Sequence, residues 1–255
     1  MGQYEMGWSK SRRLMRFPQW ITIDCHNYCD ASCGYCVYAE LAADNEYPQS
    51  FMDFGLFERL VAEMVEHADE IDSTRFGNIA EHFMTPKHWF YTEHFLASGL
   101  TMYITSNMTH IDAATMDRLD ELGWDHGELV AHVQPGMGVD YENQLLNLKE
   151  AQRRWGDRVQ HCVIDPPRGW ADYDASIPFR KATRCDAGRP DHTMIIGFDG
   201  RVQLCCQDVR QSVIVGDLNN ETISEVWNCE KVADARRALS NGEMKLCNNC
   251  EWGAT

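Results

Sequence analysis

The fold of this chain is decided by residues 20–36, which read WITIDCHNYCDASCGYC. The apolar run at residues 20–24 is typical of a β-strand, and three cysteines follow it with the spacing C-x3-C-x2-C. These cysteines are Cys29, Cys33 and Cys36, the first cysteine set. Three thiolates supply three ligands, and a [4Fe–4S] cluster held by only three cysteines keeps one iron open for another ligand.

Zinc is the alternative metal for this loop. Structural zinc takes four Cys or His ligands, usually from C-x2-C pairs, and Cys25 or His26 would complete a set of four. The C-x3-C start is unusual for a zinc ribbon, as is a position directly after the first strand of an α/β pattern. The sequence therefore favours an iron–sulfur cluster.

The bulk composition excludes several classes of protein. A chain of 255 residues can bury a sizeable core, as one large domain or as one domain with a small appendage. We expect neither a membrane-spanning helix nor a secretory signal, because no long apolar run is present. The net charge of −16 argues against sequence-independent binding of nucleic acid. Eleven cysteines then predict metal ligation in a reducing cytoplasm rather than disulfides.

Strand and helix patterns alternate along the first two thirds of the chain. We expect strands at residues 20–24, 74–79, 101–105, 128–134 and 159–165. Helices are expected at residues 53–68, from Pro86, at 112–122 with Asp112 as the cap, and at 141–154. About five βα units fit before residue 165, so the predicted fold class is α/β, with a partial, open (β/α) barrel.

The pattern changes after residue 165. Two apolar runs flank Asp199-Gly200 and predict a β-hairpin, and short helices are expected at residues 223–227 and 232–239. We divide the chain into an N-terminal extension (1–17), a barrel (18–165), a linker (166–184) and a small hairpin-and-helix domain (185–255).

A second cysteine set lies in this small domain. It consists of Cys185, Cys205, Cys247 and Cys250. Four thiolates saturate a [4Fe–4S] cluster, which is then most naturally an electron carrier. Cys205 is preferred to Cys206 as a ligand, because alternation along a strand directs the two side chains to opposite faces. A structural zinc knuckle is the alternative.

The strand followed by C-x3-C-x2-C resembles the cluster loop of the radical S-adenosylmethionine (SAM) enzymes. The order of the second half, a hairpin with Cys-Cys-Gln-Asp and a terminal C-x2-C, resembles their shortened SPASM or "twitch" domain over residues 185–251. The resemblance implies two [4Fe–4S] clusters and SAM as cofactors, the first cluster binding SAM and the second being auxiliary. It also implies reductive cleavage of SAM to a 5′-deoxyadenosyl radical.

The resemblance also implies a set of SAM-binding residues: Tyr35, Glu81, Ser106, Asn107 and His132. Glu81 matches a G-G-E-P-like segment in which Ala80 and His82 replace glycine and proline. Residues 105–109 resemble a T-N-G-T turn in which Met108 replaces the glycine. Tyr35 would border the adenine through its backbone. His132 is alternatively a core histidine bonded to a backbone carbonyl.

The activity implied by the resemblance is oxidation of a small, polar, sugar- or aminocyclitol-like substrate through the auxiliary cluster. The alternative is a redox-neutral epimerase or peptide-modifying enzyme, which needs a cysteine hydrogen donor. Cys206 is the first candidate, with Cys25, Cys162 and Cys229 behind it, and a small buried hydrophobe is its alternative role.

Partners follow from the same resemblance. We expect a small-molecule substrate rather than a peptide, because no spare domain exists for capture of a leader peptide. An electron donor such as flavodoxin or ferredoxin is expected, and neither nucleic acid nor a membrane. A zinc-binding interaction module remains the non-enzyme alternative.

Overall fold

Five parallel strands form one part of the central sheet. The computed structural model describes residues 16–34, 36, 38, 41, 48–163, 181–208, 210–248, 250 and 252–255. The parallel strands lie in the order β5-β4-β3-β2-β1. Their bounds are β1 (Trp20–Ile23), β2 (Ser73–Phe76), β3 (Met102–Ser106), β4 (Leu129–His132) and β5 (Val159–Cys162). This sequential parallel order is that of an open, partial (β/α) barrel, so the predicted fold class is confirmed.

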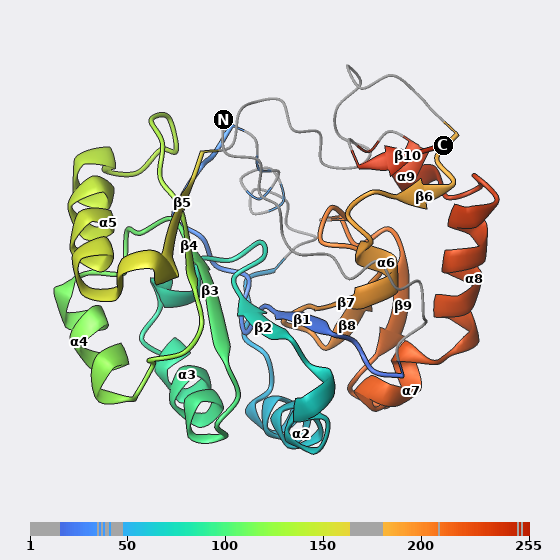
Figure 1. Ribbon diagram of the computed structural model, residues 1–255, viewed down its shortest axis with the longest axis horizontal. Helices are drawn as coiled ribbons and strands as arrows, with labels where there is room; N and C mark the ends of the chain where they lie inside the picture. Colours follow the sequence, from blue (N-terminus) through green and yellow to red (C-terminus); the bar gives the residue numbers. More distant parts are fainter. Residues whose placement is uncertain are drawn as a thin grey trace.

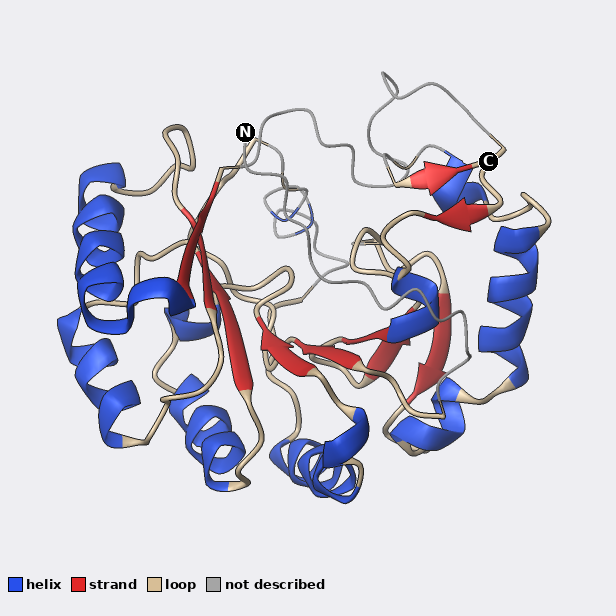
Figure 2. Cartoon of the chain, viewed as in Figure 1, coloured by secondary structure: helices blue, strands red, loops and turns tan. Residues whose placement is uncertain are grey.

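Helices join these strands on the convex side of the curved sheet (Figures 1 and 2). They are α2 (Phe54–Glu66), α3 (His88–Ala97), α4 (Ala113–Glu121) and α5 (Tyr141–Trp155), with short 3-10 helices η1 (Ala68–Glu70), η2 (His82–Met84) and η3 (Gly156–Arg158). Three helices begin where the sequence supplies an aspartate cap. The carboxylates of Asp53, Asp112 and Asp140 each accept a hydrogen bond from the backbone N–H three residues later.

The C-terminal part of the chain extends the same sheet. Strand β7 (Thr193–Ile196) pairs in parallel with β1, and β8 (Arg201–Gln203) and β9 (Ile214–Asp217) follow in antiparallel order. The result is one eight-stranded sheet. The remaining elements are β6 (Arg184–Cys185), paired with β10 (Gly253–Ala254), and helices α6 (Arg189–His192), α7 (Ile223–Trp227), α8 (Glu230–Ser240) and α9 (Lys245–Asn248).

The C-terminal hairpin was predicted as part of a separate small domain, and the structure differs in how it is joined to the barrel. The predicted hairpin is present, with a turn closed by the bond from the Gly200 N–H to the Gly197 carbonyl, 2.9 Å. The hairpin, however, is hydrogen-bonded to the barrel through β1 and continues its sheet. All four residues of β7 are buried, in keeping with a strand in the interior of a sheet rather than at an edge.

The barrel sheet has a helix-facing side and an inner side. The Phe76 ring centroid lies 6.3 Å from that of Phe57 in α2 and 4.9 Å from that of Phe95 in α3, so Phe76 faces the helices. Side chains alternate along a strand, so the neighbouring Arg75 points to the inner side. Strand register aligns Arg75 with Thr22 and Tyr103, and these three residues therefore belong to the inner face.

Gly77 ends β2 in a conformation that only glycine adopts without strain. Its φ is +86°, and a Cβ atom placed there would lie 2.5 Å from the backbone oxygen of Thr105. Gly99 is a matched reference, because its φ is +80° and no atom lies within 4 Å of the position of its Cβ.

We therefore expect Gly77→Ala to destabilise the protein more than Gly99→Ala. Both substitutions carry the backbone cost of about 1–2 kcal/mol for a left-handed residue, and only the first forces a contact with β3. The midpoint of anaerobic urea unfolding measures the difference. Equal midpoints for the two variants would show that β2 and β3 do not approach as described.

Candidate functional site

The first cysteine set lies in a loop between β1 and α2 that is tied together at its base. The Asn27 side chain accepts a hydrogen bond from the Ser50 backbone N–H at 2.7 Å and donates one to the Pro48 carbonyl at 3.0 Å. The Met52 N–H donates to the Cys25 carbonyl at 2.8 Å. These bonds fix both ends of the loop at the carboxyl edge, where the parallel strands end.

Backbone N–H groups point to sulfur atoms in both cysteine sets. In four of the seven predicted ligands the N–H two residues later donates to the cysteine sulfur. The pairs are Ala31 to Cys29, Tyr38 to Cys36, Ala187 to Cys185 and Gln207 to Cys205. Such donors stabilise a thiolate, the form of cysteine that binds metal. The donor set therefore fits iron–sulfur ligation at both places.

The cysteines of the first set lie close to one another. Cys29 interacts electrostatically with Cys36, and Cys36 with Cys33. Burial raises the pKa of the free Cys36 thiol to about 11, so a metal that binds there must displace its proton. Tyr35 lies outside the described residues, and its expected contact with adenine stays a prediction.

Asp24 joins β1 to the loop that follows β2. Its buried carboxylate accepts a hydrogen bond from the Asn78 N–H at 2.8 Å and one from the Ile79 N–H at 3.5 Å. Burial raises the pKa of Asp24 to about 7, against the opposing effect of these bonds. In the sequence Asp24 stood out only as the end of a strand, although a carboxylate directly after a strand is a usable signal for a site at this edge.

Glu81 joins the β2 loop to the β3 loop. Its buried carboxylate accepts hydrogen bonds from the Asn107 N–H at 2.7 Å and from the Ser106 hydroxyl at 3.0 Å. Burial raises the pKa of Glu81 to about 7. Three of the five residues predicted to bind SAM, Glu81, Ser106 and Asn107, are thus brought together. In this structure the Glu81 carboxylate serves to hold the other two, and SAM contact by any of them stays a prediction.

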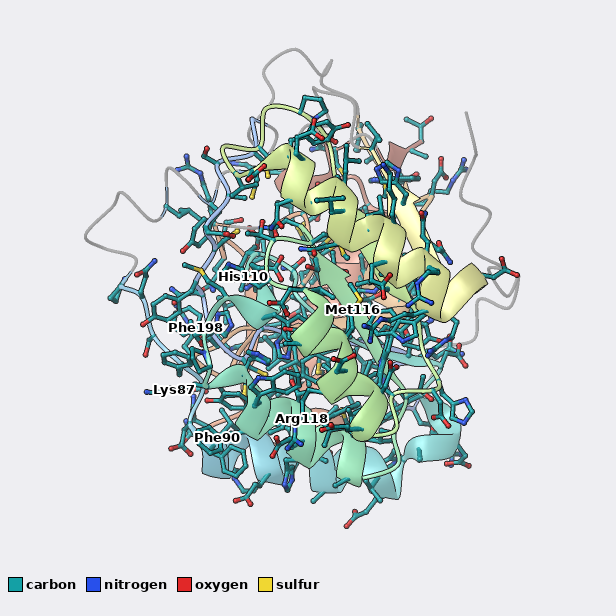
Figure 3. The ribbon with its side chains drawn as sticks, turned by 90° about the vertical axis from the view of Figure 1, so that its left-hand side faces the viewer. Lys87, Phe90, His110, Met116, Arg118 and Phe198 are labelled. Carbon is teal, nitrogen blue, oxygen red and sulfur yellow. The ribbon has the colours of Figure 1, made fainter. Side chains whose placement is uncertain are left out.

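Asp30 ties the cysteine loop to the same β3 loop. Its carboxylate accepts a hydrogen bond from the Asn107 side-chain amide at 2.9 Å and contacts the His110 ring nitrogen at 3.0 Å. Figure 3 shows His110 on the loop before α4, which carries Met116 and Arg118. Although burial opposes it, hydrogen bonding to His110 and Asn107 lowers the pKa of Asp30, and the bond to Asp30 raises the pKa of His110.

Met108 occupies the glycine position of the predicted T-N-G-T-like turn. It keeps the left-handed backbone that a glycine would take, with φ of 68°, and its side chain is fully buried. Its carbonyl accepts a hydrogen bond from the Asn147 side chain at 2.8 Å, and the Asn107 carbonyl accepts one from Gln144 at 2.7 Å. Helix α5 therefore holds the turn in place.

His82, which follows Glu81, and His132, which was predicted to bind SAM, have different surroundings. His82 is buried, its Nε2 lies 2.9 Å from the Thr92 hydroxyl, and burial lowers its pKa well below the usual value. It is therefore a core residue in this structure. His132 ends β4, is half-buried and pairs in register with Cys162. Thr105 lies two residues after Tyr103 and therefore shares its inner face, and Thr105 aligns with Val130. His132 lies two residues after Val130, so His132 and its partner Cys162 also face the inner side, at the carboxyl edge.

The second cysteine set surrounds a small cavity. All four predicted ligands line it, together with Arg189, Pro190, Gln207, Leu246 and Gly253. Within the described residues no three His, Cys, Asp or Glu side chains converge closely enough to hold a single metal ion. The cavity, its sulfur lining and the N–H donors of Ala187 and Gln207 are nevertheless features that suit a cluster with four thiolate ligands.

Cys206 does not point away from Cys205 as strand alternation suggested. Strand β8 ends at Gln203, so both cysteines lie in the turn that follows, and their thiols are hydrogen-bonded to each other. This bond lowers the pKa of Cys206, as do Arg189 and Arg75 nearby. Cys205 lines the cavity, and Cys206 lies between the cavity and the Arg75 side of the barrel.

The two cysteine sets lie at opposite ends of the β1–β7 pair. The first set follows the carboxyl end of β1. Cys185 precedes the amino end of β7, and β8 returns antiparallel to β7, so Cys205 also lies near that amino end. A four-residue strand spans about 13 Å. The inner face, with Thr22, Arg75 and Tyr103, therefore lies between the two sets.

Three comparisons with known proteins agree on this architecture. Residues 185–251 match the SPASM iron–sulfur cluster-binding domain. The chain is 21% identical over 249 residues to the S-adenosyl-L-methionine-dependent 2-deoxy-scyllo-inosamine dehydrogenase of Niallia circulans, covering 90% of this chain and 91% of that protein.

Solved structures show the same fold. The crystal structure of BtrN in complex with AdoMet and 2-DOIA matches with a TM-score of 0.75 at 17% identity, covering 91% of this chain and 92% of that one. Streptococcus suis SuiB bound to S-adenosylmethionine matches with a TM-score of 0.59 at 15% identity, covering 94% of this chain and 72% of that one.

The chain thus has the fold of the radical SAM enzymes and carries a SPASM domain, so the resemblance seen in the two cysteine motifs is confirmed. The match over residues 185–251 is to an iron–sulfur cluster-binding domain, whereas the binding of SAM, the number of clusters and the role of each predicted ligand stay predictions. No helix in the described part of the chain is long and apolar enough to cross a membrane.

The role of Glu81 as a link between loops predicts the effect of Glu81→Gln. An amide cannot accept both hydrogen bonds, so one buried donor is left without a partner at a cost of about 1–3 kcal/mol. We expect a lower midpoint of anaerobic thermal unfolding and weaker SAM binding in isothermal titration.

Glu81 also predicts how stability depends on pH. Its pKa in the folded protein, about 7, lies above its ordinary value, so the group ionises at lower pH in the unfolded chain. The wild-type protein therefore loses stability as the pH rises toward about 7. The variant should show a smaller fall in midpoint between pH 5 and 8.

Glu63→Gln is the matched control for this substitution. The Glu63 carboxylate also accepts two backbone hydrogen bonds, from Ile223 at 2.8 Å and Ser224 at 2.9 Å, far from the carboxyl-edge loops. It should lower the unfolding midpoint and leave SAM affinity unchanged. Equal SAM affinity in the wild type and both variants would contradict the link between Glu81 and the cofactor site.

Proposed function

We propose that this protein is a radical SAM dehydrogenase that oxidises a small, polar, hydroxylated molecule with the help of an auxiliary [4Fe–4S] cluster. The observation that supports it most is the placement of two cysteine sets at opposite ends of one strand pair, with a polar inner face between them. A substrate on that face lies between the source of the radical and an electron acceptor. Similarity to the 2-deoxy-scyllo-inosamine dehydrogenase points the same way.

Each part of the chain has a role in this proposal. Cys29, Cys33 and Cys36 hold the SAM-binding cluster, and the second cysteine set holds the auxiliary cluster. When bound, SAM and its cluster supply a 5′-deoxyadenosyl radical that takes a carbon-bound hydrogen atom beside a substrate hydroxyl. The substrate then loses a proton and one electron to become a ketone.

The inner face offers groups that suit hydroxyls. Arg75 supplies N–H donors, and Tyr103 and Thr22 supply hydroxyls that donate and accept. Farther along the sheet the Gln160 amide, aligned with Val130, donates to the Glu128 carboxylate at 2.6 Å. A few polar groups on a concave surface are typical of small-molecule sites.

We propose a cytoplasmic location and a flavodoxin or ferredoxin as the reductant.

A redox-neutral radical enzyme is the second candidate function. Such an enzyme needs a cysteine as hydrogen donor, and the position of Cys162 suits this role. Cys162 pairs in register with His132 at the carboxyl edge, on the side of the first cysteine set. Cys25 is buried in the core, and the Cys229 thiol donates to the Val215 carbonyl at 3.6 Å. A cysteine that returns a hydrogen atom to substrate would thus be Cys162 or Cys206.

The two cysteine sets should separate in a ligand-replacement experiment. Replacing Cys29, Cys33 and Cys36 together with Ala should abolish formation of 5′-deoxyadenosine from SAM under dithionite and leave about half of the iron. Replacing Cys247 and Cys250 should remove the other half. Formation of 5′-deoxyadenosine by the triple variant would show that the first set does not hold the SAM-cleaving cluster.

Turnover in D2O tests the proposed reaction against the redox-neutral one. With a substrate identified from a panel of sugars and aminocyclitols, a dehydrogenase gives a ketone without deuterium at the reacting carbon. Cys162→Ala and Cys206→Ala should then both retain turnover. Deuterium at carbon in the wild-type product, together with loss of turnover in either variant, would establish the redox-neutral enzyme instead.

A further inference from the structure

Arg189 is the cation that lines the cavity of the second cysteine set. It is the first residue of α6 and follows Gly188, and its guanidinium lies close enough to Cys185, Cys205 and Cys250 to interact with them electrostatically. The same interaction extends to Cys206. Nothing in the local sequence pattern marks this arginine as part of a site.

The side chain is held in place on one side and unsatisfied on the other. Its Cζ lies 5.3 Å from the centroid of the Trp252 ring, a cation–π contact. Its Nη1 is buried and has no hydrogen-bond partner among the described residues. A buried guanidinium N–H without a partner is costly, so an acceptor at this place would stabilise the fold.

The cavity supplies sulfur as that acceptor once a cluster is bound. We infer that Arg189 is a positioning residue of the auxiliary cluster: its guanidinium donates a hydrogen bond to a sulfur atom of the cluster or its ligands and raises the reduction potential of that cluster. This inference rests on the proposed function, because it takes the second cysteine set to hold a [4Fe–4S] cluster.

The direction of the effect follows from charge. A [4Fe–4S] cluster with four thiolate ligands is an anion, and uptake of one electron makes it more negative. A fixed positive charge in a buried site therefore stabilises the reduced state more than the oxidised state. Hydrogen bonds to the sulfurs act in the same direction. In the proposed reaction the substrate radical gives up one electron and one proton, and a higher potential favours transfer of that electron to the cluster.

The test is an EPR-monitored redox titration of the anaerobic holoenzyme. Two one-electron waves are expected, and the one whose spectrum changes on addition of SAM belongs to the first cysteine set. Arg189→Met should move the other wave to a more negative potential by about 59 mV. For one electron this shift corresponds to about a tenfold change in the reduction equilibrium. The SAM-responsive wave should stay where it is.

Arg184→Met is the matched control. Arg184 precedes the same Cys185, but its side chain is 54% exposed and pairs with Asp186 at 3.0 Å. Solvent screens its charge, so neither wave should move. If Arg189→Met retains too little iron, Arg189→Gln keeps an N–H donor and loses the charge, and a negative shift is again expected.

The outcomes are distinguishable. The role of Arg189 would be overturned if the SAM-insensitive wave stayed at the wild-type potential in both Arg189 variants. It would also be overturned if Arg184→Met shifted that wave by the same amount. A wild-type protein with only the SAM-responsive wave would instead refute the auxiliary cluster, and with it the proposed function.

Discussion

The carboxyl edge of the sheet depends on three carboxylates that join one loop to the next. Asp24 holds the loop after β2, and Glu81 in that loop holds the turn after β3. Asp30 brings the cysteine loop to the same turn through Asn107. One backbone bond, from the Glu81 N–H to the Tyr28 carbonyl at 2.9 Å, also joins two of these loops, and the carboxylates add the order that a multi-residue site needs.

This arrangement has an electrostatic consequence. Asp24 and Glu81 are both buried, and burial raises the pKa of each to about 7, although backbone N–H groups favour their ionised forms. Both groups therefore change charge near neutral pH, and Glu81 interacts electrostatically with Cys29 of the first cysteine set.

Local patterns made much of this fold predictable. Spacing and alternation located the five parallel strands, and Asp112 was correctly predicted as a helix cap. Contacts between distant segments were not predictable in the same way. Pairing of β7 with β1 depends on residues far apart in the chain, and β8 ends at Gln203, which places Cys205 and Cys206 in a turn with their thiols together. Arg189 was missed because only the folded chain brings it to the cysteines.

We propose that one chain holds two clusters, one at each end of the β1–β7 pair. Iron and acid-labile sulfide, measured together with the Mössbauer spectrum of the anaerobically purified protein, test it most directly. We expect about eight irons and about eight sulfides per chain in two [4Fe–4S] clusters, and a changed spectrum for one iron site when SAM is added. About four irons in a fully loaded protein, or zinc without sulfide, would contradict it.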